Sequence, residues 1–333
     1  MREQDIQVLE QYDIDVNSTR KTRGAVLCDT KQGLMLLKKL DVSKNRIPVL
    51  CKLCTHLRDY GFEPVDEIVE NREQSPISEA ADGESYILKR WFVGKECDIK
   101  RETEALEAVR NLAKLHVTLR NIELDEEELL FAHVGEDMQS MYQRHNREMK
   151  KVRTFIRKKV EKGAFESMYL ANFDKMYQVA EAAEKRLGTS GYQKLLVESR
   201  QKRMLVHGDY NYHNLIMLSR GIATTNFEHF RQDVQVADLY YFMRKVLEKN
   251  QWNTVLGNRM LEAYGYIRPI SQEEIEYLAI SISYPEKFWK AANSYYRSNK
   301  VFVPIKSVEK LEVSIRQIEQ RKRFLEQIFS FHL

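Results

Sequence analysis

Three polar side chains lie close together in one short segment of the sequence: His207, Asp209 and Asn214. The segment separates two apolar runs, 204–206 and 215–218, which we predict to be short buried strands. Phosphoryl transfer uses an Asp that accepts a hydroxyl proton and an Asn a few residues later that ligates magnesium. We therefore predict Asp209 and His207 as catalytic residues, with Asp209 as the base, and Asn214 as a metal ligand. In the alternative interpretation, Asp and Asn side chains merely form a turn between two strands.

The composition is that of a globular protein that can bury a large core, since 43% of its 333 residues are hydrophobic and 10% are aromatic. The formal charge of +4 does not require a nucleic-acid partner. No apolar run reaches the roughly 20 residues that span a bilayer, so we expect no membrane partner. The charged N-terminus does not resemble a secretory signal, and the four cysteines are too scattered for a disulfide framework. We therefore expect the protein to be made in a reducing cytoplasm.

The first part of the chain is predicted to be a β-rich lobe with one helix. The expected elements are three strands within 12–40, a helix over about 42–60, and strands over 65–69 and 85–92. The third strand ends in Lys38 and Lys39, at the position where a kinase N-lobe carries the Lys that holds the nucleotide phosphates. Lys38 is therefore the predicted cofactor-binding residue, with Lys39 as its close competitor. Alternatively, both lysines simply end a strand in solvent.

Beyond residue 92 the spacing of apolar residues changes from two to about 3.6, which predicts helices. The expected helices cover 102–119, 139–162, 165–187, 252–264, 273–283 and 308–331. The pattern predicts an α+β protein that changes from strands to helices near residue 92. The aromatic-Gly connector after the strand at 85–92 resembles the hinge between kinase lobes, which implies an N-lobe over 1–92 and a C-lobe over 93–333 with the catalytic-loop segment 204–230. The basic helix at 139–162 could bind nucleic acid. Apolar residues interleave at core spacing, however, and favour an ordinary solvated helix face.

The segment from His207 to Asn214, His-Gly-Asp-x-x-x-x-Asn, resembles the catalytic loop of the aminoglycoside-phosphotransferase branch of the protein-kinase-like fold. Together with Asn226-Phe227-Glu228 and residues 236–252, it makes the chain similar to the CotS family of spore coat proteins, a branch of the same superfamily. The resemblance implies a two-lobed kinase-like fold, and ATP and magnesium as cofactors of its active members. It also implies other spore coat proteins as partners, with synthesis in the mother-cell cytoplasm and a place in the spore coat.

Three departures from active members accompany this resemblance. Asn226 stands where active members carry a metal-binding Asp, and it offers a neutral amide where Mg²⁺ prefers a carboxylate. We take Asn226 and Glu228 as the further candidate metal ligands. The loss of one charge beside the metal would cost several kcal/mol of transition-state stabilisation, on the order of hundreds-fold in rate. The first hairpin offers only Gly24 to approach phosphates, and the helix at 42–60 contains no Glu to pair with the strand Lys.

These features predict a kinase-like spore coat protein that is a degenerate kinase and acts as a coat-assembly module. In the alternative, the protein is an active ATP- and magnesium-dependent phosphotransferase that acts on a small-molecule or protein hydroxyl with Asp209 as base. Intact Asp209 and Asn214 favour the enzyme, whereas Asn226, the single glycine of the hairpin and the missing helix Glu favour the module. The sequence identifies no small-molecule substrate.

Overall fold

The computed structural model describes residues 3–120, 122–297 and 305–332, and the chain divides into two compact units. Unit 1 comprises Met1–Val134, Ser199–Phe242 and Tyr266–Arg268. Unit 2 comprises Gly135–Glu198, Met243–Gly265 and Pro269–Leu333. The division into lobes at residue 92 is a different partition and stays a prediction.

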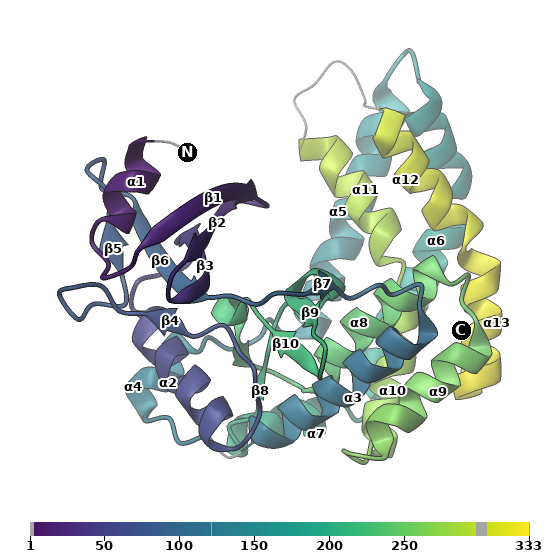
Figure 1. Cartoon of the computed structure of the whole chain (residues 1–333). Helices are drawn as coiled ribbons and strands as arrows, with labels where there is room; N and C mark the ends of the chain where they lie inside the picture. Colours follow the sequence, from purple (N-terminus) through teal and green to yellow (C-terminus); the bar gives the residue numbers. More distant parts are fainter. Residues whose placement is uncertain (1–2, 121, 298–304, 333) are drawn as a thin grey trace. The chain divides into compact units, whose positions relative to one another are not determined.

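Unit 1 is built on an antiparallel sheet with the strand order β1-β2-β3-β6-β4, in which β5 also pairs with β6 (Figure 1). Its strands are β1 (Val16–Thr22), β2 (Ala25–Thr30), β3 (Gly33–Lys39), β4 (Ile68–Val69), β5 (Ser78–Glu79) and β6 (Ser85–Arg90). One face is apolar: Val26, Leu37 and Leu88 pack there with Val8 of α1 (Glu3–Leu9). Since side chains alternate across a strand, the neighbours of these residues along each strand point to the opposite face of the sheet.

The rest of unit 1 holds helices and short strands that position the predicted catalytic loop. The helices are α2 (Arg46–Asp59), α3 (Glu102–Thr118) and α4 (Glu126–Phe131). The short strands are β7 (Lys95–Glu96), β8 (Leu205–Val206), β9 (Leu215–Met217), β10 (Ile222–Thr224) and β11 (Arg231–Gln232). Strand β9 pairs with β7 and β10, and β8 pairs with β11. The catalytic loop thus runs from one small sheet to another, fixed at both ends by strand pairing.

Unit 2 is helical. Its helices are α5 (Met138–Lys158), α6 (Ala164–Thr189), α9 (Thr254–Gly265), α10 (Gln272–Ser283), α11 (Glu286–Arg297), α12 (Ile305–Arg316) and α13 (Ile318–Phe329). Helices α7 (Tyr192–Gln201) and α8 (Val236–Lys249) belong partly to each unit. Buried aromatic rings form much of the core, and Tyr142 and Tyr284 stack with ring centroids 3.8 Å apart. Among the described residues, no helix is both long and apolar enough to cross a membrane.

Most of the helices and strands predicted from regularly spaced apolar residues are confirmed. Helices predicted over 102–119 and 139–162 are observed as α3 and α5, and the three N-terminal strands are observed as β1 to β3. The prediction of one helix over 308–331 was wrong. The chain forms α12 and α13 instead, with Gln317 between them, and the Gln317 side chain donates a hydrogen bond to the Glu248 carbonyl (3.1 Å). Apolar spacing continues through this break, so the sequence pattern did not reveal it.

Candidate active site

The predicted base, Asp209, is half-buried and held by two amides of its own loop. Asn211 Nδ2 donates to Asp209 Oδ1 (2.9 Å), and Asn214 Nδ2 donates to Asp209 Oδ2 (3.0 Å). Each carboxylate oxygen therefore accepts one N–H, which fixes the orientation of the group. The structure thus brings Asp209 and Asn214 together, as the spacing of the motif predicts.

The backbone of the loop is held by Asp238 of α8, which accepts from the N–H groups of His207 (2.7 Å) and Gly208 (3.1 Å). Burial alone would raise the pKa of Asp238, but the hydrogen bond from His116 (3.3 Å) and nearby positive charge lower the pKa overall. Gly208 has φ +82°, and a Cβ there would collide with the His229 carbonyl oxygen. Glycine is therefore required at this turn.

His207 is fully buried, and both ring nitrogens have partners. Its Nε2 lies 3.0 Å from the Thr225 carbonyl oxygen, and its Nδ1 accepts from the Asp209 N–H (3.2 Å). The ring therefore ties the catalytic loop to the strand that leads to Asn226. This position fits a residue that positions Asp209, and the catalytic role predicted for His207 stays a prediction.

Asn226 occupies the second predicted metal position and forms a hydrogen bond with Asn214 at the first. Its Nδ2 donates to Asn214 Oδ1 (2.9 Å), and its backbone N–H donates to Asp66 Oδ2 (2.7 Å). The residue adopts a left-handed conformation, with φ 64° and ψ 55°, which Asn tolerates better than most side chains. The oxygen that Asn214 would offer to a metal therefore accepts a hydrogen bond from the second predicted metal position.

These donors fit a magnesium ion poorly. Mg²⁺ is usually held by carboxylates and requires near-octahedral oxygen geometry. The described parts of the chain contain no group of three or more His, Cys, Asp or Glu side chains that could hold a metal ion. Asp209 is the one carboxylate in the set Asp209, Asn214 and Asn226, and both its oxygens already accept amide hydrogens.

Glu228 lies at the centre of a buried ion cluster rather than beside Asn214. Its Oε1 lies 3.2 Å from Lys38 Nζ and 2.8 Å from Lys89 Nζ, and Lys89 Nζ also donates to Asp66 Oδ2 (2.6 Å). The Lys38 side chain is 20% exposed, whereas the other three side chains are at most 1% exposed. We call Lys38, Lys89, Asp66 and Glu228 the lysine cluster; it holds two cations and two anions.

The two carboxylates of the lysine cluster differ in their proton affinity. Burial alone would raise the pKa of Glu228, but the ammonium groups of Lys89 and Lys38 lower it to about 2. Burial raises the pKa of Asp66 and the charge of Glu228 adds to this, whereas Lys89 and the Asn226 N–H only partly oppose the rise. Lys89 itself would lose its proton more easily through burial, but the two carboxylates reverse this and raise its pKa. Glu228 is therefore the charged partner that both lysines share.

Strand register explains why these lysines converge. Lys38 of β3 lies opposite Ile87, and Leu36 lies opposite Lys89 of β6, so both lysine side chains leave the same face of the sheet. Lys39 leaves the opposite face and pairs with Glu84 (2.7 Å). Of the two lysines that the sequence left open, Lys38 is the one that the structure places with Glu228. Its role in nucleotide binding stays a prediction.

Helix α2, which contains no Glu for the strand lysine, contributes Arg46 instead. The buried guanidinium donates to the carbonyl oxygens of Glu228 (3.1 Å), Phe230 and Phe131. It also lies 4.5 Å from the centre of the Phe230 ring. Arg46 thus fixes the backbone of the segment that carries Glu228, and Glu228 supplies the carboxylate that Lys38 needs.

The tip of the β1–β2 hairpin also contacts the catalytic loop. Arg23 lies 3.5 Å from Glu96 and also contacts the ring of His213, which in turn lies 2.6 Å from Glu96. At the tip of the hairpin, Arg23 precedes Gly24 and forms a partly exposed charged group with Glu96 and His213.

Sequence reasoning missed Lys89 and Asp66. One signal was available for Lys89, because a lysine that follows three buried residues in Tyr86-Ile87-Leu88-Lys89 is unusual unless it is paired. Asp66 had no such signal, since its partner lies on another strand.

The fold is the kinase-like fold that aminoglycoside phosphotransferases share. The chain superposes on an aminoglycoside phosphotransferase from Alicyclobacillus acidocaldarius with a TM-score of 0.86 and 17% identity, covering 98% of this chain and 95% of the other. It superposes on the AMP-bound complex of a spectinomycin phosphotransferase with a TM-score of 0.72 and 13% identity, covering 99% of each chain. These likenesses confirm the predicted α+β kinase-like fold.

More specifically, the chain belongs to the family described as "Spore coat putative kinase YutH", whose profile matches residues 5–328. It is also similar to spore coat protein S of Bacillus subtilis (strain 168), with 22% identity over 294 residues, which cover 86% of this chain and 81% of the other. The predicted relationship to kinase-like spore coat proteins is therefore confirmed.

Proposed function

We propose that this protein is a degenerate kinase that retains the kinase-like fold as an assembly module of the spore coat. The observation that carries the proposal is the hydrogen bond between Asn226 Nδ2 and Asn214 Oδ1 (2.9 Å). It joins the two positions that would otherwise hold the metal. Two amides satisfy each other here without a cation, whereas a carboxylate at 226 would place two acceptors face to face.

The lysine cluster supports the same proposal. Lys38 is the residue expected to hold nucleotide phosphates, yet its Nζ lies 3.2 Å from the buried Glu228 carboxylate. Since Glu228 is fully buried and stays ionised down to about pH 2, the positive charge of Lys38 is already compensated within the fold. The Glu228 carboxylate is thus the counter-ion of Lys38 and does not serve a metal.

The relatives suggest where such a module acts. The family description and the name of spore coat protein S both point to the coat, and we propose other coat proteins as partners. On this proposal the protein is made in the mother-cell cytoplasm and incorporated into the coat.

A second candidate function is an active phosphotransferase on a small-molecule or protein hydroxyl. The geometry of Asp209 favours it, since Asn211 and Asn214 orient the carboxylate as a base requires. The solved relatives include complexes with AMP and with AMP-PNP and Ca²⁺, which supports ATP and a divalent metal as the cofactors of this alternative.

Complementation separates the two functions. A spore-forming host without its own copy would express the wild type, Asp209→Asn, or Lys89→Met as a folding-defective reference. Asp209→Asn keeps the size and one acceptor oxygen of the side chain, so the fold should survive. We expect it to restore coat localisation and the coat protein profile as the wild type does. Loss of coat assembly with a stably folded Asp209→Asn protein would favour the enzyme.

A further inference from the structure

A strongly cationic concavity lies within unit 2 and is lined by residues of α8, α11 and α12. It is a pocket of about 620 Å³, within the usual range for small-molecule sites. Five cationic side chains line it: Arg244, Lys245, Lys287, Lys290 and Lys310. We call these residues the cationic pocket. Among its described lining residues, one is acidic, Glu309.

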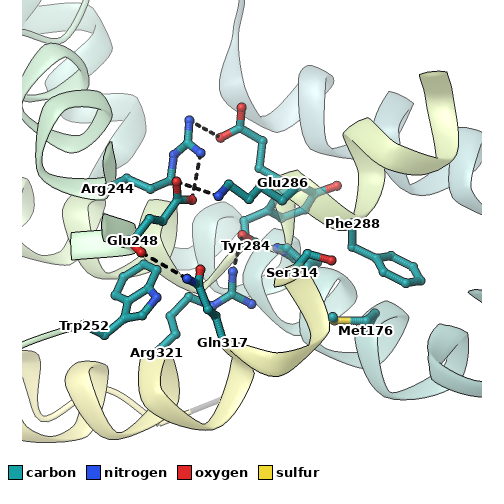
Figure 2. A pocket seen from close by; sticks show the side chains of 12 residues that line it. Met176, Arg244, Glu248, Trp252, Tyr284, Glu286, Phe288, Ser314, Gln317 and Arg321 are labelled. Atoms are coloured by element: carbon teal, nitrogen blue, oxygen red, sulfur yellow. Dashed lines mark hydrogen bonds and ion pairs between the residues drawn. The ribbon is translucent and has the colours of Figure 1, made fainter. Parts of the chain in front are cut away.

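Three of the cations are held by carboxylates behind the pocket. Arg244 lies 3.1 Å from Glu248 and 3.4 Å from Glu286, Lys287 lies 2.7 Å from Glu248, and Lys290 contacts Glu286. Figure 2 shows the Arg244 guanidinium between these two carboxylates. The ion pairs fix the cations in place before any ligand arrives, which reduces the entropy cost of binding.

The described lining of the pocket carries more positive than negative charge. It has five cations and one acid, Glu309, and the carboxylates of Glu248 and Glu286 lie in ion pairs with three of the cations. Burial lowers the pKa of Lys245, and the charge of Arg244 lowers it further. Both effects disfavour the charged form of this lysine, so an anion that binds beside it would be stabilising.

The rest of the lining suits a compact polar ligand. Ser294 and Ser307 bring hydroxyl groups from α11 and α12, and Ala291 and Val313 contribute apolar surface. A hydroxyl, a guanidinium and ammonium groups together match the several acceptor oxygens of a phosphate group. The pocket shown in Figure 2, which shares Arg244 and Lys287 with the cationic pocket, measures only about 20 Å³ and has room for about one water molecule.

We propose that the cationic pocket binds a small organic phosphate, that is, a compact molecule with at least two negative charges. A dianion would neutralise the excess charge, and a concavity enclosed by three helices suits a small molecule better than an extended acidic peptide. The site is separate from the Asp209 loop and independent of whether that loop is catalytic, because it is formed entirely by residues of unit 2.

Calorimetric titration of the full chain with inorganic pyrophosphate tests the proposal, with citrate and a hexaglutamate peptide as competing anions. The variants are Lys245→Gln and Lys310→Gln. Lys306→Gln is the matched control, since Lys306 lies one turn from Lys310 on α12 and does not line the pocket. Lys38→Met is the control for binding at the lysine cluster. Circular dichroism and urea unfolding would show that each variant is folded.

We expect saturable pyrophosphate binding in the wild type and a loss of roughly tenfold in affinity in each pocket variant, as for one lost charge-assisted hydrogen bond. Binding should be unchanged in Lys306→Gln and in Lys38→Met. Equal losses in Lys306→Gln would mean non-specific attraction and overturn the proposal, as would loss in Lys38→Met alone. Tighter binding of citrate or of hexaglutamate would assign the pocket to carboxylates or to an acidic protein segment and would also overturn it.

Discussion

The lysine cluster of unit 1 and the cationic pocket of unit 2 use similar side chains in opposite ways. In the lysine cluster, Lys38 and Lys89 meet two buried carboxylates, so the charges balance and little of the group reaches solvent. In the cationic pocket, the described lining has five cations and one acid around an open concavity. Balanced, buried charge stabilises a fold, whereas a concentration of like charge at a pocket attracts an oppositely charged ligand. On our proposals, the lysine cluster has a structural role and the cationic pocket binds phosphate.

The largest effect should follow from breaking the balanced cluster. In Lys89→Met, Asp66 loses its ammonium partner and two buried carboxylates share only Lys38, so we expect a loss of about 3–5 kcal/mol in the free energy of unfolding. Urea denaturation measures it. Lys39→Met is the control. Lys39 follows Lys38 on β3 and has an exposed side chain, so the urea midpoint of this variant should barely change. Equal effects in both variants would contradict the assigned register.

A smaller loss is expected for Lys38→Met. Glu228 keeps Lys89 at 2.8 Å, so one charged hydrogen bond is lost instead of two, at a cost of roughly 1–2 kcal/mol. The same denaturation series measures this difference. A loss as large as that of Lys89→Met would mean that Lys38, not Lys89, is the main counter-ion of Glu228.

Acid should weaken unit 1 through Glu228. Its pKa is lowered from 4.5 to about 2 in the fold, so the stabilisation is fully present above pH 4.5 and is lost as the pH falls toward 2. Asp66 acts in the opposite sense, because its raised pKa means that the folded state binds a proton more readily than the unfolded state. Unfolding free energies of the wild type should therefore fall more steeply between pH 4.5 and pH 2 than those of Glu228→Gln. Parallel curves would contradict the ion pairing.

The smallest effect on stability should come from the cationic pocket. Removal of one positive charge from an unbalanced group relieves repulsion, so Lys310→Gln should unfold at a urea midpoint equal to or above that of the wild type. A marked loss of stability in Lys310→Gln would place the pocket lysines in a structural network like that of unit 1.

Much of the fold and the loop could be predicted from the sequence because the signals are local. The spacing in His207-Gly208-Asp209 and Asn214 specifies one loop, and long apolar periods specify helices such as α3 and α5. Asp238, in the first turn of α8, holds this loop through two backbone hydrogen bonds.

The lysine cluster could not be predicted because its contacts depend on pairing between distant strands. Lys38 and Lys89 meet only when β3 and β6 adopt the observed register, and Asp66 joins them from the chain before β4. The sequence likewise showed that α2 lacks a Glu, but it could not show that Glu228, far along the chain, would take its place beside Lys38. The sequence of α2 shows that the Glu is missing, and only the tertiary structure shows that Glu228 replaces it.

The amide pair of Asn226 and Asn214 is tested most directly by a thermal-shift titration with ATP, with and without Mg²⁺, on the wild type and on Asn226→Asp. A ligand that binds the folded state raises its stability by about 2.7 kcal/mol at one hundred times its Kd. We predict that Mg²⁺ leaves the response of the wild type to ATP unchanged. In Asn226→Asp, the new carboxylate would face the Asn214 oxygen, so the variant should be less stable without metal. Mg²⁺ would bind between these two acceptors, so the variant should gain a Mg²⁺-dependent shift. A Mg²⁺-dependent shift of several degrees in the wild type would contradict the account and restore the enzyme as the better hypothesis.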